Sequence, residues 1–209
     1  MYMIKPDGIK NIIFDLGNVL IPLQMEQAGL EFRKLISDQS GIKDPMELSY
    51  LESFTLYETG KISTKDFFQS LKPYFKEEVS ISDFEIAWNM IIGDLPDAHA
   101  RLLKRLSNRY QLFLLSNTNE LHANHFEYKI DGILNIHQVF KKVYYSHLEG
   151  FRKPQKEIYQ RVLDQNRLKP SETLFADDLR ENIESASELG IQTLQVTPDI
   201  NLEKCFEAF

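Results

Sequence analysis

Short apolar runs and amphipathic helical patterns alternate along the second half of the chain. The apolar runs are three to five residues long and lie at 111–115, 143–145, 173–176 and 193–196. Helical spacing of apolar residues occurs between or before them, at 97–108, 155–165 and 180–189. This alternation is typical of βαβ units in a parallel sheet. Residues 12–14 form a similar run without polar alternation, so we expect a further strand of that sheet, buried on both faces.

The chain between the first run and the alternating region has a different pattern. Residues 24–95 show about four amphipathic helices and no convincing strand. Pro45 suits a first helical position, and Gly60 suits the residue that ends the helix. Ser82 and Glu85 fit a capping box at the start of the last helix. The expected organisation is an α/β core of residues 1–21 and 96–209, with an α-helical cap of residues 22–95 inserted after the first strand.

Polar residues that suit catalysis follow the expected strands. Binding sites in open parallel sheets lie beyond the carboxyl ends of the strands. The residues at these ends are Asp15 and Gly17 after the first strand, Ser116 and Asn117 after the second, Lys153 beyond the third, and Asp177 with Asp178 after the fourth. We expect these segments, which are far apart in the sequence, to meet at one edge of the sheet.

The chemistry of this set points to phosphate and a divalent cation. Asp15, Asp177 and Asp178 would repel one another, and each would resist ionisation without a counter-charge. A hard cation such as Mg²⁺ relieves that repulsion. Lys153 supplies positive charge to a phosphate group. A carboxylate can attack phosphorus and form an aspartyl-phosphate, and Asp15 is the candidate because its strand is expected to be central.

Composition and charge narrow the partners. The 209 residues are 43% hydrophobic and 26% charged, as in globular proteins, and the net charge is -7. A negative chain lacks the basic face that non-specific binding to nucleic acid or anionic membranes requires. Cys205 is the single cysteine, so no intrachain disulfide is expected and a reducing compartment fits. No secretory signal or membrane-length apolar run is visible, so we expect a cytoplasmic protein; its oligomeric state stays open.

Four segments are similar to the motifs of the haloacid dehalogenase-like (HAD) hydrolase superfamily. In chain order they are FDLGNVL, LLSNTN, FRKPQKEIYQRVL and LFADDLRENIESASELG. The resemblance covers nearly the whole chain and is closest to the helical-cap branch, with bacterial sugar-phosphate phosphatases such as α-D-glucose-1-phosphatase. It implies a Rossmann-like parallel-sheet core with an inserted helical cap. It also implies Mg²⁺-dependent hydrolysis of a small phosphorylated metabolite through an aspartyl-phosphate. Sugar phosphates are among the candidate substrates.

The same resemblance implies a role for each matched residue. Asp15 would be the nucleophile, and Lys153 would stabilise the charge of the reacting group. The metal ligands would be Asp15, the backbone carbonyl of Gly17, Asp178 and, in direct contact or through a neighbouring group, Asp177. The phosphate group would be bound by Ser116, Asn117 and Lys153.

Gly17 departs from the pattern of the family. Most of its phosphatases have a second aspartate there, which protonates the leaving alkoxide and then activates water; such a role is typically worth about 10²–10⁴-fold. Three interpretations stay open. Another group, from the cap or through water, transfers the proton; or the substrate has a good leaving group, such as an anomeric hydroxyl or an acyl phosphate; or the protein is a slow or non-catalytic binder of phosphate esters.

Other functions fit the residues less well. A mutase normally needs the aspartate that Gly17 replaces. A 2-haloacid dehalogenase would tolerate Gly17, since halide needs no acid, but it has no need of the Asp177–Asp178 pair. A non-enzymatic protein could use the pocket for sensing. His122 and His125 are interpreted as packing or surface residues and not as metal ligands.

Overall fold

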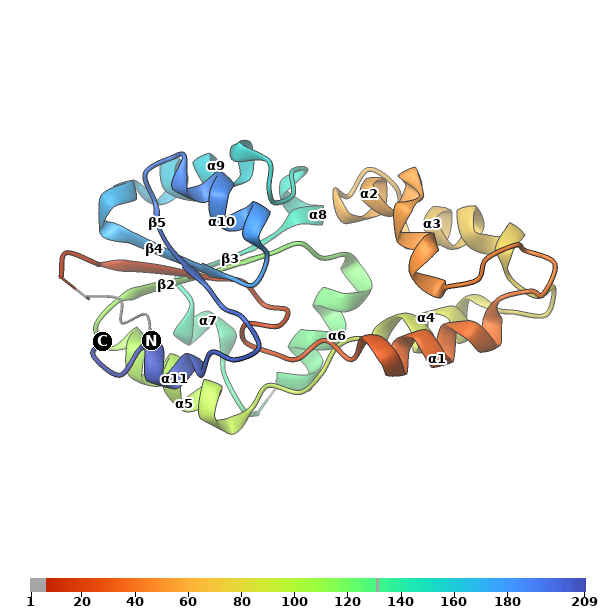
Figure 1. Ribbon diagram of the computed structural model, residues 1–209, viewed down its shortest axis with the longest axis horizontal. Coiled ribbons are helices and arrows are strands. Elements are labelled where there is room, and N and C mark those ends of the chain that lie inside the picture. Colours follow the sequence, from red (N-terminus) through yellow and green to blue (C-terminus); the bar gives the residue numbers. More distant parts are fainter. Residues whose placement is uncertain (1–6, 131) are drawn as a thin grey trace.

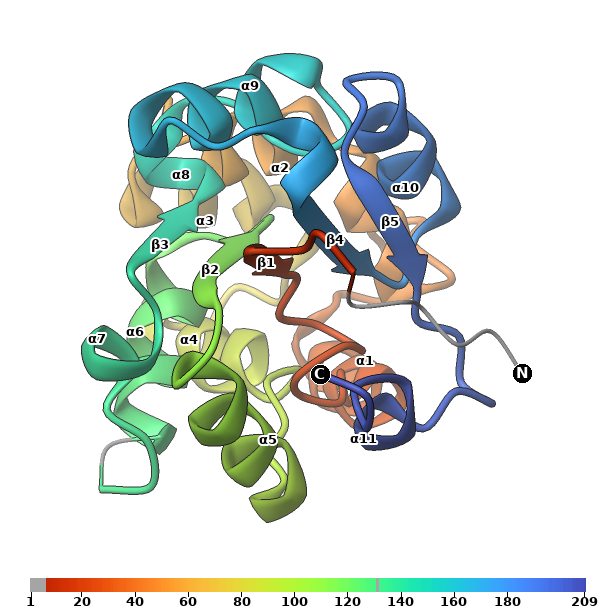
Figure 2. The same cartoon turned by 90° about the vertical axis from the view of Figure 1, so that its left-hand side faces the viewer.

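The computed structural model describes residues 7–130 and 132–209. Residues 1–6, which belong to the expected core and to the segment searched for a secretory signal, lie outside this part of the chain. Five parallel strands form one sheet in the order β3-β2-β1-β4-β5. Their bounds are β1 (Asn11–Phe14), β2 (Gln111–Ser116), β3 (Lys142–Tyr145), β4 (Thr173–Asp177) and β5 (Gln192–Gln195). Figure 2 shows them side by side with β1 in the middle, as predicted.

Helices cover both faces of this sheet. Their bounds are α5 (Asp97–Ser107), α6 (Glu120–Ile130), α7 (Ile136–Val139), α8 (Ser146–Glu149), α9 (Lys156–Asn166), α10 (Arg180–Ser187) and α11 (Leu202–Cys205), with a 3₁₀ turn at Pro170–Glu172. Figure 1 shows α9 and α10 on one face and α5, α7 and α11 on the other. The architecture is a Rossmann-like α/β core, which confirms the predicted fold class.

The apolar strand sequences result from this double cover. Successive side chains of a strand point to opposite faces, so Ile13 packs with α9 residues such as Tyr159. Its neighbours Ile12 and Phe14 instead join the cluster that contains Leu103 of α5. A strand between two helical layers has no face for polar residues, which explains the runs without alternation.

The region between β1 and α5 is helical. It contains α1 (Met25–Leu35), a 3₁₀ helix (Pro45–Tyr50), α2 (Glu52–Glu58), α3 (Thr64–Leu71), a 3₁₀ turn (Lys72–Tyr74) and α4 (Ile81–Asn89). Figure 1 shows these helices beyond the carboxyl ends of the strands. They have a separate aromatic core, in which the Trp88 ring lies 5.1 Å from Phe67, 5.4 Å from Phe84 and 5.7 Å from Phe32. We refer to them as the cap.

Two chain segments connect the cap to the core, and they run beside each other. The N–H of Gln24 donates to Ile91 O at 2.9 Å, and the N–H of Gly93 donates to Pro22 O at 3.1 Å. A Cβ atom at Gly93 would lie 2.3 Å from Pro22 O. The close approach therefore requires glycine at this position.

Two local predictions in the cap were wrong. The capping box of α4 is formed by Ser80 and Asp83, not by Ser82 and Glu85: Asp83 Oδ2 accepts from the Ser80 N–H at 2.9 Å, and Ser80 Oγ accepts from the Asp83 N–H. The helix that begins at Pro45 is also not continuous to Gly60. Extended backbone at Leu51 separates a 3₁₀ helix from α2. In the described part of the chain, we find no helix with the length and apolar character of a membrane span.

Candidate active site

Three carboxylates converge at the carboxyl end of the central strand. Phe14 pairs with Ala176 in the parallel register of β1 and β4, so the next residues, Asp15 and Asp177, are neighbours. Asp178 follows, and each acid offers one oxygen within 4.8 Å of the others. Asp15 and Asp177 are buried, and Asp178 is half-buried. The structure therefore brings together the three acids that the sequence placed at this edge.

The ammonium group of Lys153 lies between two of these acids. Its Nζ donates to Asp15 Oδ1 at 2.5 Å and to Asp177 Oδ2 at 2.7 Å. Lys153 is only 2% exposed. A buried charge costs several kcal/mol unless it is paired and hydrogen-bonded. The two ion pairs therefore make this position possible for a lysine.

Burial gives the cluster unusual proton affinities. Removal from water and, to a smaller extent, the neighbouring Asp177 raise the pKa of Asp15 to about 7, against the opposing effect of Lys153. For Lys153, burial favours the neutral amine, but Asp15 and Asp177 outweigh this effect and raise its pKa above the usual value. When the three acids are ionised, their charge exceeds that of the ammonium. Carboxylates with excess charge are suitable ligands for Mg²⁺, so the donor set fits this ion.

The two neighbouring acids of the fourth motif differ in their hydrogen bonds. Asp177 Oδ1 accepts from the N–H two residues later at 2.9 Å and from Asn182 Nδ2 at 2.8 Å, while Oδ2 accepts from Lys153. Asp178 Oδ2 accepts from Asn18 Nδ2 at 3.1 Å. Burial raises the pKa of Asp178, against the effect of Asn18. Asp177 is therefore held by protein donors through both oxygens, whereas Asp178 has more free acceptor capacity.

Leu23 fills the space beside Gly17. A Cβ atom at Gly17 would lie 2.9 Å from Leu23 Cδ1, so any side chain there would displace Leu23. Asn18 fixes this loop in the left-handed conformation (φ 54°), and its Oδ1 accepts from the Leu23 N–H at 3.1 Å. An apolar side chain thus lies next to the position where most phosphatases of the resembled family have an acid.

Ser116, the last residue of β2, and Asn117, the residue after it, have different surroundings. Ser116 is buried, and its Oγ makes one long contact, 3.5 Å, to the Asn117 carbonyl. The Asn117 amide contacts the backbone of Lys153 twice: Oδ1 accepts from its N–H at 2.7 Å, and Nδ2 donates to its carbonyl at 2.8 Å. The Ser116 hydroxyl has capacity for a ligand. The Asn117 side chain positions Lys153, a contact that the sequence did not indicate.

Sequence reasoning assigned no role to three further polar residues at this edge. Asn182 donates to Asp177 from the first turn of α10, and its place five residues after that acid was the available signal. Asn18 links the first loop to Asp178. Ser146 Oγ accepts from the Thr118 N–H and donates to the Thr118 carbonyl, both at 2.9 Å. No sequence pattern indicates that Ser146 and Thr118 lie next to each other.

His122 is a packing residue where α6 meets the cap. Its ring stacks on Trp88 with centroids 5.0 Å apart. Nε2 lies 2.9 Å from the Trp88 carbonyl and Nδ1 lies 3.1 Å from Asn119 Nδ2. A neutral ring with its proton on Nε2 satisfies both contacts, because a carbonyl only accepts and an amide nitrogen only donates. Burial lowers the pKa of His122 to about 4, which agrees with the neutral form.

This histidine predicts a loss of stability in mild acid. Between pH 6.5 and about 4 the unfolded chain binds a proton that the folded chain excludes. Stability is therefore full above pH 6.5 and falls as the pH falls toward 4, by about 3 kcal/mol in all at about 1.4 kcal/mol for each pKa unit. His122→Gln should remove this contribution. Urea unfolding near pH 7.5 and near pH 5 measures it; an equal loss in the variant and the wild type would contradict this role for His122.

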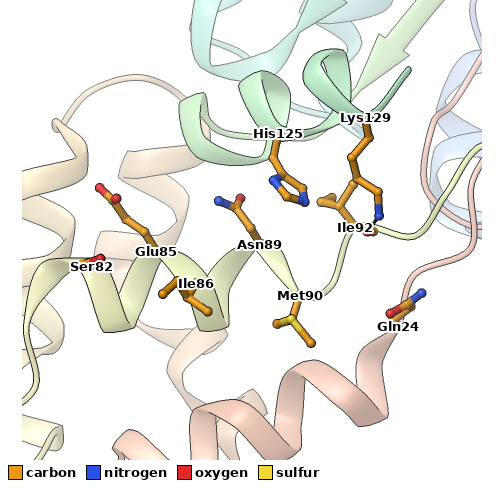
Figure 3. Close-up of a pocket in the computed structure, with 9 residues that line it drawn as sticks. All are labelled: Gln24, Ser82, Glu85, Ile86, Asn89, Met90, Ile92, His125 and Lys129. Atoms are coloured by element: carbon orange, nitrogen blue, oxygen red, sulfur yellow. Dashed lines mark hydrogen bonds between the residues drawn. The ribbon is translucent and has the colours of Figure 1, made fainter. Parts of the chain in front are cut away.

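A surface hollow lies away from the cluster of acids. Figure 3 shows it between α4 and α6, where His125 and Lys129 point toward Asn89 and Ile92. Its volume is about 400 Å³, and none of the clustered acids lines it. His125 therefore belongs to a surface hollow at the junction of cap and core, separate from the carboxylates.

Known proteins with similar sequences belong to the family whose motifs this chain resembles. The sequence profile of the haloacid dehalogenase-like hydrolases matches residues 12–196. A D-ribitol-5-phosphate phosphatase of Bacteroides thetaiotaomicron is 30% identical over 191 residues, which are 90% of this chain and 91% of that protein. A sesquiterpene phosphatase, AstK, of Aspergillus oryzae is 28% identical over 208 residues, 95% of this chain and 94% of that protein.

Solved structures agree. The crystal structure of a HAD family enzyme from Bacteroides thetaiotaomicron, in complex with magnesium and inorganic phosphate, superposes with a TM-score of 0.83 at 30% identity. The superposition covers 95% of this chain and 99% of that chain. With a profile match over most of its length and relatives of full length, this protein belongs to the haloacid dehalogenase-like hydrolase family.

Proposed function

We propose that this protein is a Mg²⁺-dependent phosphatase of a small, hydroxylated phosphate ester, such as a sugar or polyol phosphate, and that it works through an aspartyl-phosphate on Asp15. The observation that carries the proposal is the cluster of Asp15, Asp177 and Asp178, in which the buried Lys153 ammonium contacts the first two acids. The relatives named as phosphatases and the magnesium and phosphate complex of a family member support it.

The residues divide the work as follows. Asp15, Asp178 and the backbone carbonyl of Gly17 would hold Mg²⁺, which supplies positive charge for the phosphate oxygens and the carboxylates. Asp177, whose oxygens accept from protein donors, orients Lys153. Lys153 in turn would neutralise charge that develops on the transferred group.

In the first step a carboxylate oxygen of Asp15 attacks phosphorus in line. A new O–P bond forms while the bond from phosphorus to the ester oxygen breaks, and the electron pair leaves with that oxygen. The Ser116 hydroxyl, which is free apart from its long contact, would donate to a phosphate oxygen. Gly17 has no side chain to protonate the leaving oxygen, so that proton would come from water.

In the second step water attacks phosphorus of the acyl phosphate. The bond between phosphorus and Asp15 breaks, inorganic phosphate leaves and the carboxylate is regenerated. Two easier displacements thus replace one difficult hydrolysis. The attachment of Lys153 to the Asn117 amide keeps the ammonium in place through both steps.

The glycine at position 17 predicts a strong dependence on the leaving group. Without a side-chain acid, the leaving oxygen keeps its negative charge in the transition state. We therefore expect kcat/KM to rise steeply as the pKa of the leaving phenol falls in a series of substituted phenyl phosphates. A flat series, with rates independent of that pKa, would show that another group of this protein protonates the leaving oxygen.

The proposed activity itself needs only purified protein. We expect release of p-nitrophenol from p-nitrophenyl phosphate with Mg²⁺ and none after chelation with EDTA. Halide release from chloroacetate, without phosphate release from any ester, would identify a dehalogenase instead. A protein inactive in both assays would be a binder of phosphate esters or another ligand.

Which phosphate ester is hydrolysed would be determined by the cap and by the core residues that face it. The two curated relatives have names with very different substrates, a polar polyol phosphate in one and an apolar terpenyl phosphate in the other. A panel of sugar 1-phosphates, sugar 5- and 6-phosphates, polyol phosphates and terpenyl phosphates should separate these classes. We expect the hydroxylated esters to be preferred.

A further inference from the structure

A buried carboxylate oxygen without a hydrogen bond lies where the cap meets the core. Among the residues that the structure describes, four buried side-chain atoms have no hydrogen bond: Glu58 Oε2, Asn89 Oδ1, His147 Nδ1 and Asn182 Oδ1. Glu58 ends α2 and His147 belongs to α8, and Figure 1 shows these two helices next to each other. Leaving such an atom unsatisfied is costly. An unsatisfied carboxylate oxygen at the contact between cap and core therefore points to a ligand that completes it.

The backbone fixes this contact closely. A Cβ atom at Gly60 would lie 1.9 Å from the His147 carbonyl, and Gly60 has a positive φ of 66°. The turn after α2 therefore rests directly on α8. Glu58, two residues before this glycine, is only 8% exposed although it is charged. Its position follows from the chain geometry and is not that of a mobile surface side chain.

Arg152 is the cation that faces this carboxylate. Its Nη1 lies 3.2 Å from Glu58 Oε2, so the two side chains form an ion pair. Oε2 nevertheless has no hydrogen bond, because the N–H groups of Arg152 do not point at it. Burial raises the pKa of Glu58, and Arg152 and Lys153 oppose that rise. The field of the catalytic lysine thus reaches the cap carboxylate.

The contact between Glu58 and Arg152 lies close enough to the acid cluster to be a substrate subsite. Arg152 directly precedes Lys153, whose ammonium contacts Asp15. The helix that carries His147 begins at Ser146, which is hydrogen-bonded to the Thr118 backbone at the end of β2. The polar group between cap and core therefore adjoins the same edge of the sheet as the proposed phosphate site.

We propose that Glu58 and Arg152 form a subsite for the hydroxyl groups of the substrate, so that this pair selects polyhydroxylated phosphate esters. This inference rests on the proposed phosphatase function. A hydroxyl group both donates and accepts, so one hydroxyl can donate to Glu58 while another accepts from Arg152. An apolar group would offer no hydrogen bond to the carboxylate or the guanidinium, and sites built for hydroxyl groups reject analogues without them by large factors.

The test compares two kinds of phosphate ester in the Glu58→Gln variant. The hydroxylated probes are D-ribitol 5-phosphate, D-ribose 5-phosphate and glycerol phosphate, and the probe without hydroxyl groups is p-nitrophenyl phosphate. The variant keeps the shape of Glu58 and weakens one acceptor. We expect KM for the best hydroxylated probe to rise at least about tenfold, as for the loss of one hydrogen bond to a charged group. For p-nitrophenyl phosphate, kcat/KM should stay within about twofold, since it makes no such bond.

Two further variants complete the design. Glu52→Gln, at the exposed start of the same helix α2, is the matched control and should change neither substrate. Arg152→Lys keeps the charge but removes the planar donor pair, and it should shift KM in the same selective way. This variant carries the test if Glu58→Gln fails to fold, as judged by circular dichroism.

The outcomes separate the two proposals. If wild-type protein hydrolyses no probe, the phosphatase proposal itself is wrong. If it hydrolyses p-nitrophenyl phosphate but no hydroxylated ester, or if terpenyl phosphates are preferred, the phosphatase stands and the subsite is overturned. Equal effects of Glu58→Gln on both kinds of ester would show that the residue only holds cap and core together. An unchanged KM in both Glu58→Gln and Arg152→Lys would also refute the subsite.

Discussion

The Asp15→Asn variant is expected to fold normally and to lose at least about a thousandfold in kcat, because an amide cannot replace the carboxylate as nucleophile. The substitution changes one atom at the end of β1 and leaves the strand pairing with β2 and β4 intact. Lys153 keeps its second ion pair, to Asp177. Steady-state hydrolysis of p-nitrophenyl phosphate gives the rate, and far-ultraviolet circular dichroism gives the fold.

The control for this variant is Asp97→Asn. Asp97 lies in the first turn of α5 and is exposed, so the same chemical change there should leave kcat unaltered. Retained turnover in Asp15→Asn, with the fold intact, would exclude an aspartyl-phosphate at this residue. The three-carboxylate site would then have to act through an activated water molecule.

The second large effect is expected from Asp178→Ala. Asp178 has one hydrogen bond from Asn18 and free acceptor capacity, whereas Asp177 is held through both oxygens. Removal of the freer carboxylate should weaken Mg²⁺ binding by at least about tenfold, as for the loss of a ligand that carries charge. Hydrolysis should fall to the level of wild-type protein treated with EDTA. Calorimetric titration with MgCl₂ measures the affinity without any substrate.

A milder variant separates ligand loss from loop damage. Asn18→Ala removes the hydrogen bond to Asp178 and keeps the carboxylate, so Mg²⁺ affinity should fall less than in Asp178→Ala. If Asp178→Ala binds Mg²⁺ as wild-type protein does, the metal lies elsewhere and Asp177 becomes the candidate ligand.

The sequence was informative wherever a local pattern determines the structure. Apolar runs of three to five residues predicted β1 to β5 because the strands are covered on both faces. The parallel arrangement then implied that Asp15 and Asp177 meet, and their register in the sheet agrees. The error at the start of α4 has a local cause as well: Ser80–Asp83 and Ser82–Glu85 both fit the capping pattern, and hydrogen bonding selects the first.

Contacts between distant segments could not be predicted in this way. The amide of Asn117 reaches the backbone of Lys153 across 36 positions. The ion pair of Glu58 and Arg152 joins the cap to the core. Neither contact follows from a regular spacing in the sequence. The first joins two loops of the core, and the second depends on how the cap sits on the strand ends. If the proposed subsite is correct, specificity depends on a contact that the periodicity of the sequence does not describe.

Gly17 illustrates the same division. Its lack of an acid is visible in the sequence, but the packing of the Leu23 side chain into the space beside it, six residues later, is not. The loop that carries both residues is fixed by Asn18. Addition of an acid at Gly17 would thus require movement of Leu23 as well as the substitution itself.

A rapid-quench experiment with wild-type protein tests most directly whether phosphate is transferred to Asp15. Protein in excess is mixed with Mg²⁺ and p-nitrophenyl phosphate, quenched in acid within one turnover, digested and measured by mass spectrometry. We expect the mass of one phosphoryl group on the peptide that contains Asp15, and none in Asp15→Asn. A phosphoryl group on a different residue, or stoichiometric release of p-nitrophenol with no covalent phosphate at any quench time, would contradict the proposed mechanism.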